Sequence, residues 1–359
     1  MRIFYDARYT RIDFHDGISR YGLELGNALA KLTDLTFLIC DERQRQFLPE
    51  GAKTITIHAP ASFKEPFTSL ILNKYHPDVV FSPLQTMGTI GRRFKLILSL
   101  HDMIYYRHRT PPKFLSPLIR FGWWLFHLTY IPQRLNLNGA SAVVTVSENS
   151  KQDILKARLT KRPVIVAPNA PQQLQRYLSK PVTAPKKTAT NLVYMGSFMP
   201  YKNVETLIRG LKYLPGYTLH LLSRIDPERK AEYQKMTPRG AKVIFHNGVT
   251  DEQYAKLLAD KALLVSASFD EGYGLPLAEA LELGVPVVAS DLQIFREVAG
   301  DGALYFPADD AEAYAEKVKL ASTPESFAAL SKKGKRHISQ YSWEKSAKTL
   351  LDSIKSLQN

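Results

Sequence analysis

The sequence of 359 residues predicts two α/β domains, each a Rossmann-like doubly wound fold with a parallel sheet covered by helices on both faces. The chain is too long for one compact α/β domain and fits two of ordinary size. Short apolar runs alternate with helical patterns in both halves. Several of these runs are apolar throughout, as expected for strands that helices cover on both faces.

The first half of the chain predicts an N-terminal domain over residues 1–170. Its expected strands are Arg2–Tyr5, Leu35–Cys40, Thr54–His58, Asp78–Ser82, Lys95–Leu100, Ala142–Ser147 and Val164–Ala167. Its expected helices include Ile18–Leu32 and Pro117–Leu137. The strand runs are apolar and short, whereas the helical segments have the longer period of an amphipathic helix.

Residues 171–190 are rich in Pro, Gln, Lys and Thr without periodicity, so we interpret them as a linker. The alternation resumes in a C-terminal domain over residues 191–340. Its expected strands are Leu192–Gly196, Thr218–Leu222, Val243–His246, Leu263–Ser266, Val285–Ala289 and Leu304–Phe306. Its expected helices are Val204–Tyr213, Asp251–Leu258 and Pro276–Leu283. Residues 341–359 are expected to form a helix that packs back on the N-terminal domain.

Composition favours a cytoplasmic protein. The single cysteine, Cys40, excludes a disulfide within the chain. Met1 leads directly into the first expected strand, and no signal peptide is expected. The longest apolar stretch, 118–131, is interrupted by Arg120 and His127 and is shorter than the roughly 20 apolar residues that span a bilayer. We therefore do not expect an integral membrane protein.

The net charge of +14 is concentrated in one part of the chain. Residues 92–190 contain 17 lysines and arginines and three acidic residues, Asp102, Glu148 and Asp153. Such asymmetry attracts an anionic surface or partner. Charge alone leaves nucleic acid, anionic lipid and a phosphorylated acceptor open.

An apolar and aromatic segment, Pro117–Tyr130, lies inside this basic region. The basic residues that flank it are Arg107, Arg109, Lys113 and Arg134. Trp, Phe and Leu beside Lys and Arg are typical of a helix lying in a membrane interface. A buried core helix is the alternative, although Trp123 and Trp124 are adjacent and one of them is expected to face outward.

The most informative motif runs from Phe269 to Glu279. It follows an apolar run expected to be a buried strand, and it leads into a helix that ends at Gly284. Glu271 therefore lies in the loop and Glu279 about one turn into the helix, near the end whose N–H groups and dipole attract anions. Carboxylates that accept hydroxyls, beside a site for phosphate, suggest a sugar nucleotide. Spacing alone leaves open whether Glu279 or Glu282 turns inward.

Three further positions are candidates. Gly17 opens an expected helix whose N–H groups could meet a phosphate, but no G-x-G-x-x-G is present and an ordinary turn is the alternative. His101 directly follows a buried strand, where a structural histidine is the alternative. Lys202 follows the strand that ends at Gly196 and could neutralise a leaving diphosphate, unless it is simply an exposed lysine.

With these motifs in this order, the chain resembles the retaining glycosyltransferases of family four (glycosyl transferases group 1), which have the GT-B fold. The resemblance extends over essentially the whole chain. It rests on the Gly17 loop, Gly196 to Asn203, Glu271 to Glu279, and Gly284 to Ser290. It implies two Rossmann-like domains facing an interdomain cleft, with the acceptor on the N-terminal domain and the donor on the C-terminal domain.

The resemblance also implies roles for individual residues. Glu271 would hold hydroxyls of the donor sugar, Glu279 the nucleotide ribose, and Lys202 the diphosphate, while His101 would lie near the transferred sugar. The catalytic set is then His101, Lys202 and Glu271. The donor-binding set is Gly17, Gly196, Ser197, Lys202, Asn247, Gly248, Val249, Glu271, Gly272, Tyr273, Gly274, Leu275 and Glu279.

One position departs from the family pattern. Many members carry an arginine five residues before the lysine, where this chain has Ser197. Arg20 and Arg224 are two hypotheses for a replacement cation.

The implied reaction is hexose transfer with retention of configuration, in which the leaving diphosphate accepts the proton of the acceptor. The donor is expected to be GDP-mannose, with a UDP-hexose next, which favours a mannosyltransferase of cell-envelope glycan biosynthesis. The acceptor is expected to be an anionic lipid-linked or glycan molecule met at the inner face of the cell membrane. No Asp-x-Asp pair follows a strand, so no cofactor and no essential metal are expected.

Other function classes remain as alternatives. A GT-B epimerase or phosphorylase is the nearest enzyme class, and Glu271 and Glu279 with their glycines argue against both. A nucleic-acid-binding protein would use the positive charge, but no recognised binding motif accompanies it, so no nucleic-acid partner is expected. An inactive sugar-binding protein is the third, and Ser197 favours it slightly.

Overall fold

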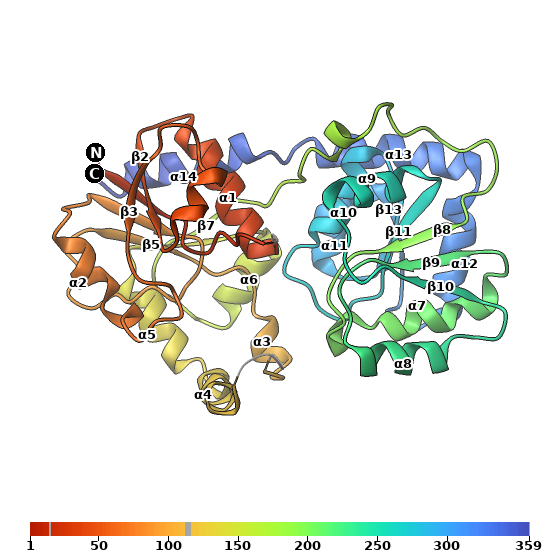
Figure 1. Cartoon of the computed structure of the whole chain (residues 1–359), viewed down its shortest axis with the longest axis horizontal. Helices are drawn as coiled ribbons and strands as arrows, with labels where there is room; N and C mark the ends of the chain where they lie inside the picture. The colour runs from red at the N-terminus through yellow and green to blue at the C-terminus, as the bar shows by residue number, and fades with distance from the viewer. Residues whose placement is uncertain (14–15, 112–115, 359) are drawn as a thin grey trace. The chain divides into compact units, whose positions relative to one another are not determined.

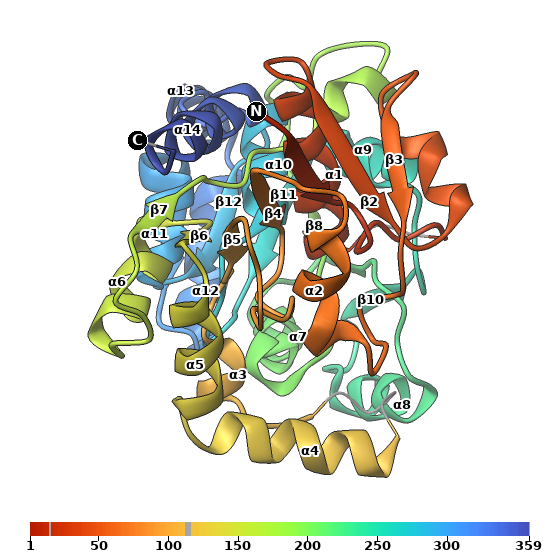
Figure 2. The same ribbon diagram turned by 90° about the vertical axis from the view of Figure 1, so that its left-hand side faces the viewer.

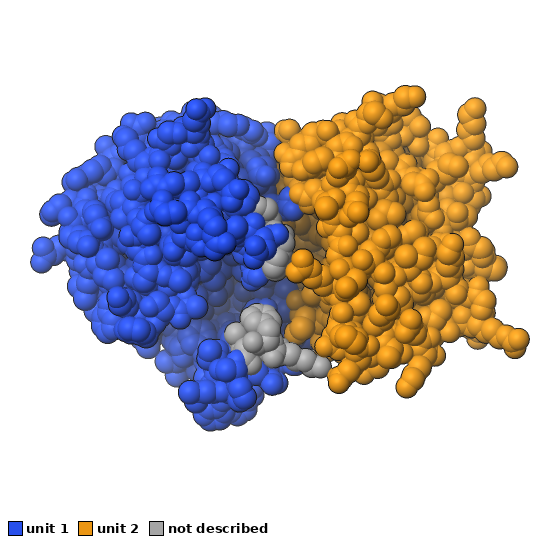
Figure 3. Space-filling model, viewed as in Figure 1, with its two compact units in different colours: residues 1–169, 342–359 blue, residues 170–341 orange. Residues whose placement is uncertain are grey.

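The computed structural model describes residues 1–13, 16–111 and 116–358. The chain divides into two compact units, one formed by residues 1–169 and 342–359 and the other by residues 170–341 (Figures 1 and 3). Each unit has its own parallel sheet and core. His15 of the expected glycine loop and Lys113 lie outside the described residues.

The sheet of the first unit is parallel throughout, in the order β3-β2-β1-β4-β5-β6-β7. Its strands are β1 Ile3–Asp6, β2 Leu35–Ile39, β3 Lys53–Thr56, β4 Val79–Ser82, β5 Lys95–Ser99, β6 Ala142–Thr145 and β7 Val164–Val166. The central strands β1, β4 and β6 are buried along their whole length, because helices cover both faces.

The helices of the first unit lie on both sides of this sheet (Figures 1 and 2). They are α1 Gly17–Ala30, η1 Glu42–Phe47, η2 Glu65–Phe67, α2 Thr68–Asn73, α3 Ile104–Arg107, α4 Pro117–Leu128, α5 Ile131–Gly139, α6 Glu148–Lys156 and α14 Trp343–Ser356. The C-terminal helix α14 packs on α1, and Ser346 Oγ donates a hydrogen bond to the carbonyl of Pro168 at 2.7 Å.

The expectation of one helix over Pro117–Leu137 was wrong, because two helices occupy this range. Thr129 has extended backbone angles of −135° and 160° and ends α4. Pro132 stands in the first turn of α5, where its missing N–H is tolerated, whereas inside a continuous helix its ring would clash with the preceding turn.

The sheet of the second unit is also parallel, in the order β10-β9-β8-β11-β12-β13. Its strands are β8 Asn191–Tyr194, β9 Thr218–Leu221, β10 Lys242–Phe245, β11 Ala262–Ser266, β12 Val287–Ser290 and β13 Ala303–Phe306. Parallel strands in this order, connected through helices, confirm the prediction of two Rossmann-like sheets.

Helices cover this second sheet as well (Figure 1). They are η3 Leu174–Tyr177, η4 Pro200–Lys202, α7 Val204–Gly210, η5 Leu211–Tyr213, α8 Pro227–Met236, α9 Asp251–Ala259, α10 Leu275–Leu283, α11 Gln293–Ala299, η6 Gly300–Gly302, α12 Ala311–Ser322 and α13 Pro324–Ile338. The segment interpreted as a linker, 171–190, is part of this unit, where η3 packs against α9 and α10 and Leu174 is buried.

Candidate functional site

Two loops meet at the carboxyl edge of the second sheet. The loop after β8 passes through η4 to Asn203, which adopts a left-handed conformation (φ 49°, ψ 44°) between η4 and α7. The Asn203 side-chain amide donates to the carbonyl of Ala267 at 3.0 Å, and the N–H of Phe269 donates to the carbonyl of Tyr201 at 2.7 Å. These bonds join the loop after β8 to the loop after β11.

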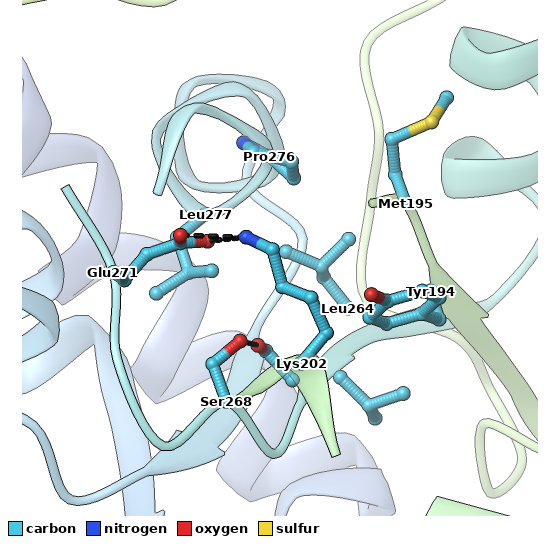
Figure 4. Close-up of a pocket in the computed structure, with 10 residues that line it drawn as sticks. Tyr194, Met195, Lys202, Leu264, Ser268, Glu271, Pro276 and Leu277 are labelled. Carbon is cyan, nitrogen blue, oxygen red and sulfur yellow. Dashed lines mark hydrogen bonds and ion pairs between the residues drawn. The ribbon is translucent and has the colours of Figure 1, made fainter. Parts of the chain in front are cut away.

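This junction brings Lys202 and Glu271 into direct contact. The ammonium of Lys202 lies 2.6 Å from both carboxylate oxygens of Glu271 (Figure 4). Both side chains are largely shielded from solvent, with 12% and 14% of their surface exposed. The alternative of an exposed lysine is therefore wrong, because Lys202 is a shielded cation in a charge-assisted contact.

A small pocket adjoins this ion pair, with a volume of about 10 Å³, which is room for about one water molecule. The residues that line it are Tyr194, Met195, Lys202, Leu264, Val265, Ser266, Ser268, Glu271, Pro276 and Leu277. Figure 4 shows the Lys202 side chain running through it toward Glu271, with Pro276 of α10 close by. The pocket thus combines a cation, a carboxylate and hydroxyls at the carboxyl ends of β8 and β11, where such sheets bind ligands.

Gly196 and Ser197 belong to the loop that carries Lys202. The Tyr194 hydroxyl donates to the carbonyl of Ser197 at 2.6 Å, and a Cβ on residue 196 would stand 2.7 Å from that hydroxyl oxygen. Burial, and then the charge of Glu271, raise the pKa of Tyr194 well above its ordinary value, which keeps the donor proton in place. Glycine at 196 is therefore required for this loop to turn beneath Tyr194.

The N-terminus of α10 depends on Gly274. This residue has φ 97° and ψ 51°, and a Cβ would approach Phe295 Cε1 to 2.9 Å. Pro276 has no N–H, so Leu275 supplies the N–H group at the start of the first turn. Gly272 and Tyr273 are buried, and the Tyr273 ring packs edge-on against Tyr341 instead of lining the pocket.

The two glutamates of α10 differ in burial, which the sequence had left open. Glu279 is buried with 5% of its surface exposed. Glu282 is half-buried, and burial raises the pKa of its carboxyl although a backbone hydrogen bond from Leu174 opposes the shift. Glu279 is therefore the inward member of the pair, and its predicted contact with a ribose stays a prediction.

Asn247, Gly248 and Val249 form the loop between β10 and α9. Gly248 has φ 106° and donates its N–H to the carbonyl of Leu222 at 2.8 Å. A Cβ at Gly248 would lie 3.2 Å from Cγ of Arg224, so the Arg224 side chain runs beside this loop.

The first unit holds its own group of candidates. His101 follows β5, and its Nε2 donates to the carbonyl of Pro83 at 2.7 Å. Its ring packs edge-on against Tyr21 of α1 at 4.7 Å, and α1 begins at Gly17, after the Asp16 N-cap. Burial lowers the pKa of His101, although the bond to Pro83 and the charge of Asp16 oppose the shift. The imidazole is therefore neutral near pH 7, with the lone pair of Nδ1 as a hydrogen-bond acceptor.

One buried cluster was not predicted from the sequence. Arg8 forms an ion pair with Asp6 at 2.8 Å and another with Glu65 at 2.7 Å, and His58 Nε2 lies 3.1 Å from Glu65. Burial alone would lower the pKa of Arg8, but Asp6 and Glu65 more than offset it and the pKa is raised. An aspartate ending a buried strand, two residues before an arginine, was the available signal. The cluster ties the segment around residues 58–65 to the end of β1.

The described residues lack a metal-binding cluster and a membrane-spanning helix. Residues 1–13, 16–111 and 116–358 contain no group of three or more His, Cys, Asp or Glu side chains arranged to hold a metal ion. Within those same ranges no helix has the length and apolar character needed to cross a bilayer.

Comparison with known proteins extends over both units. The family described as glycosyl transferases group 1 matches residues 175–337, and the one described as Glycosyltransferase Family 4 matches residues 15–170. The O-antigen chain mannosyltransferase B of Escherichia coli is 27% identical over 241 residues, which make up 62% of this chain and 62% of that protein. The O-antigen chain mannosyltransferase RfbU of Salmonella typhimurium is 24% identical over 317 residues, 84% of this chain and 86% of that protein.

A solved structure matches the whole chain. HepE from Anabaena, in complex with UDP and glucose, aligns with a TM-score of 0.72 over 99% of this chain and 100% of that chain at 18% identity. At this identity the match concerns the fold, which is GT-B as predicted.

Proposed function

We propose that this chain, whose two halves match the families described as Glycosyltransferase Family 4 and glycosyl transferases group 1, transfers mannose from GDP-mannose to a lipid-linked or glycan acceptor. The observation that carries this proposal is the shielded contact of Lys202 with Glu271 in a pocket at the carboxyl edge of the second sheet. The names of the two mannosyltransferases to which it is similar favour mannose. A UDP-hexose is the second candidate donor, since HepE was solved with UDP and glucose.

Stabilisation of the leaving diphosphate is the main chemical requirement. The Lys202 ammonium and the Leu275 N–H at the start of α10 would supply positive charge to the phosphate oxygens. Glu271, next to Lys202, would accept hydrogen bonds from sugar hydroxyls, and the buried Glu279 would accept them from the ribose. Asn247, Gly248 and Val249 would contact the base.

Retention of configuration would follow from attack on the face that the diphosphate leaves. The bond from the anomeric carbon to the phosphate oxygen breaks as the acceptor oxygen bonds to that carbon, and the acceptor proton passes to the departing phosphate. The charge on that phosphate is then met by Lys202 and the helix terminus, so we propose no essential metal. Loss of activity in EDTA that magnesium or manganese restores would contradict this.

Arg224 is the candidate cation to replace the arginine that many family members have at the position of Ser197. The backbone N–H of Gly196 donates to Ser223 Oγ at 3.2 Å, so the residue before Arg224 touches the loop that carries Ser197. The Arg224 side chain runs past Gly248 on the other side. Arg224 thus lies between the loop expected to meet the phosphates and the loop expected to meet the base. Arg20 belongs to the first unit.

His101 would act in its neutral form. Its Nε2 proton is committed to Pro83, so Nδ1 would accept a hydrogen bond from a hydroxyl of the transferred sugar. The acceptor would be anionic and would be met at the inner, cytoplasmic face of the cell membrane, in cell-envelope glycan synthesis.

The experiment that tests the donor is a thermal-shift screen of nucleoside diphosphates. A ligand at about a hundred times its dissociation constant stabilises the folded chain by about 2.7 kcal/mol. We expect GDP to raise the melting temperature most, with UDP second, and Lys202→Met to remove the shift. A chain that no nucleoside diphosphate stabilises would refute the proposal.

A further inference from the structure

Helix α4 has its polar and apolar faces reversed. Its inner face carries Arg120, Trp123 and His127 at helical spacing, and His127 is buried. The His127 ring contacts Trp123 at a centroid distance of 4.0 Å and Tyr106 at 4.9 Å. A surface helix of a globular protein buries its apolar stripe and exposes its polar one, and α4 does the opposite.

The outer face of α4 is formed by large apolar side chains. They are Leu118, Ile119, Phe121, Trp124, Leu125, Phe126 and Leu128, and Leu118 is 81% exposed. Ile131 and Leu135 of the next helix, α5, are exposed as well. Monomeric proteins rarely leave so many neighbouring apolar side chains uncovered, so this face is adapted to an apolar environment.

The part of the chain that contains α4 is strongly basic. Residues 92–162 contain 13 lysines and arginines and three acidic residues. Arg107 is in α3, Arg109 follows it, and Arg134 is in α5. Two copies of so basic a region would repel each other, whereas a bilayer with anionic headgroups offers both the apolar layer and the opposite charge.

We propose that α4 lies flat in the headgroup region of an anionic lipid bilayer, with its outer face among the first methylenes of the acyl chains. Twelve residues of helix extend about 18 Å, which is shorter than the hydrocarbon core is thick, so α4 lies along the surface. Basic side chains of residues 92–162 would then meet phosphate groups; of these, Arg107 also pairs with Asp153 at 2.9 Å, and Arg134 also donates to the carbonyl of Ala157 at 2.8 Å. Figure 2 shows α4 at the edge of its unit, below α3 and α5. This inference deepens the proposed function by naming the surface on which the enzyme meets a lipid-linked acceptor.

The test is co-sedimentation of the full chain with phosphatidylcholine vesicles that contain or lack phosphatidylglycerol. We expect binding only with the anionic lipid, and weaker binding at high salt. Replacing both Leu118 and Leu125 by Glu should weaken it roughly a hundredfold, since burial of each leucine is worth about a factor of ten. Leu320→Glu is the matched control, because Leu320 is an exposed leucine of α12 in the other unit and should leave binding unchanged.

The fluorescence of Trp124 gives a second measurement of membrane binding, made with α4 in its natural sequence. Its fluorescence should shift to shorter wavelength on vesicle binding, and Trp124→Phe should remove most of that shift. Three results would each overturn the proposal. They are no vesicle binding, vesicle binding that neither salt nor the two glutamate substitutions weaken, and a dimer that depends on α4 while the chain does not bind vesicles. Vesicle binding is measured without donor. A chain that binds vesicles but no nucleoside diphosphate would therefore retain this inference and lose the proposed function.

Discussion

The contact between Lys202 and Glu271 predicts that these two residues act as one unit in stability. The perturbation is Lys202→Met, Glu271→Gln and both together. Either single change leaves a shielded charge without its partner, and both together leave none. The double variant should therefore be much less destabilised than the sum of the single ones.

The size of this coupling follows from the geometry. Two unit charges 2.6 Å apart attract by about 6 kcal/mol at an effective dielectric constant of about 20. In each single variant the remaining charged side chain turns toward water, because the pair keeps 12% and 14% of its surface exposed, and this relaxation lowers the measured coupling by several kcal/mol. We therefore expect a net coupling of about 2 kcal/mol.

The assay is urea unfolding of the full chain, followed by far-ultraviolet circular dichroism, for all four members of the cycle. The matched control is the pair Lys256 and Glu252 on α9, which is also 2.6 Å apart but more than half exposed. That pair should show no coupling beyond experimental error. Additive effects at Lys202 and Glu271, within about 0.5 kcal/mol, would refute the reasoning.

Three further predictions concern single residues. Burial lowers the pKa of His101 below its ordinary value of 6.5, so the imidazole is neutral above pH 6.5. We therefore expect kcat/KM to stay constant above pH 6.5 and to fall only at lower pH. His101→Asn should remove this fall at low pH. Gly274→Ala should destabilise the chain by about 1–3 kcal/mol, because φ is 97° and Phe295 is in the way, whereas Gly122→Ala in open space on α4 should not. Arg224→Met should weaken nucleoside-diphosphate binding roughly tenfold and leave the free energy of unfolding unchanged. An unchanged affinity would show that Arg224 does not contact the ligand.

Most strands were predictable because they are short apolar runs in a parallel sheet, whereas β3, with the sequence Lys-Thr-Ile-Thr, is only partly buried. Every expected strand overlaps an observed one within a few residues, as with Leu263–Ser266 and β11. The helix over Pro117–Leu137 was mispredicted since apolar content continues through the break at Thr129. Apolar content does not predict which side of α4 faces the protein either, because that depends on which side chains of α3 pack against α4.

The candidate site was predictable as a set of loops but not as a set of contacts. Strand ends and glycines placed Lys202 and Glu271 at the same edge of the second sheet. Their direct ion pair depends on the left-handed turn at Asn203, which no local pattern specified. The cluster of Arg8 with Asp6 and Glu65 joins residues 57 positions apart, a separation that a single sequence does not reveal.

Sugar transfer itself provides the most direct test of the central claim. The measurement is release of GDP and incorporation of labelled mannose when the full chain is incubated with GDP-mannose and a lipid extract. The account predicts that both depend on the extract, that the product keeps the anomeric configuration of the donor, and that Lys202→Met and Glu271→Gln each abolish transfer. Unchanged transfer in both variants, or GDP release that needs no acceptor and yields no glycoside, would contradict it.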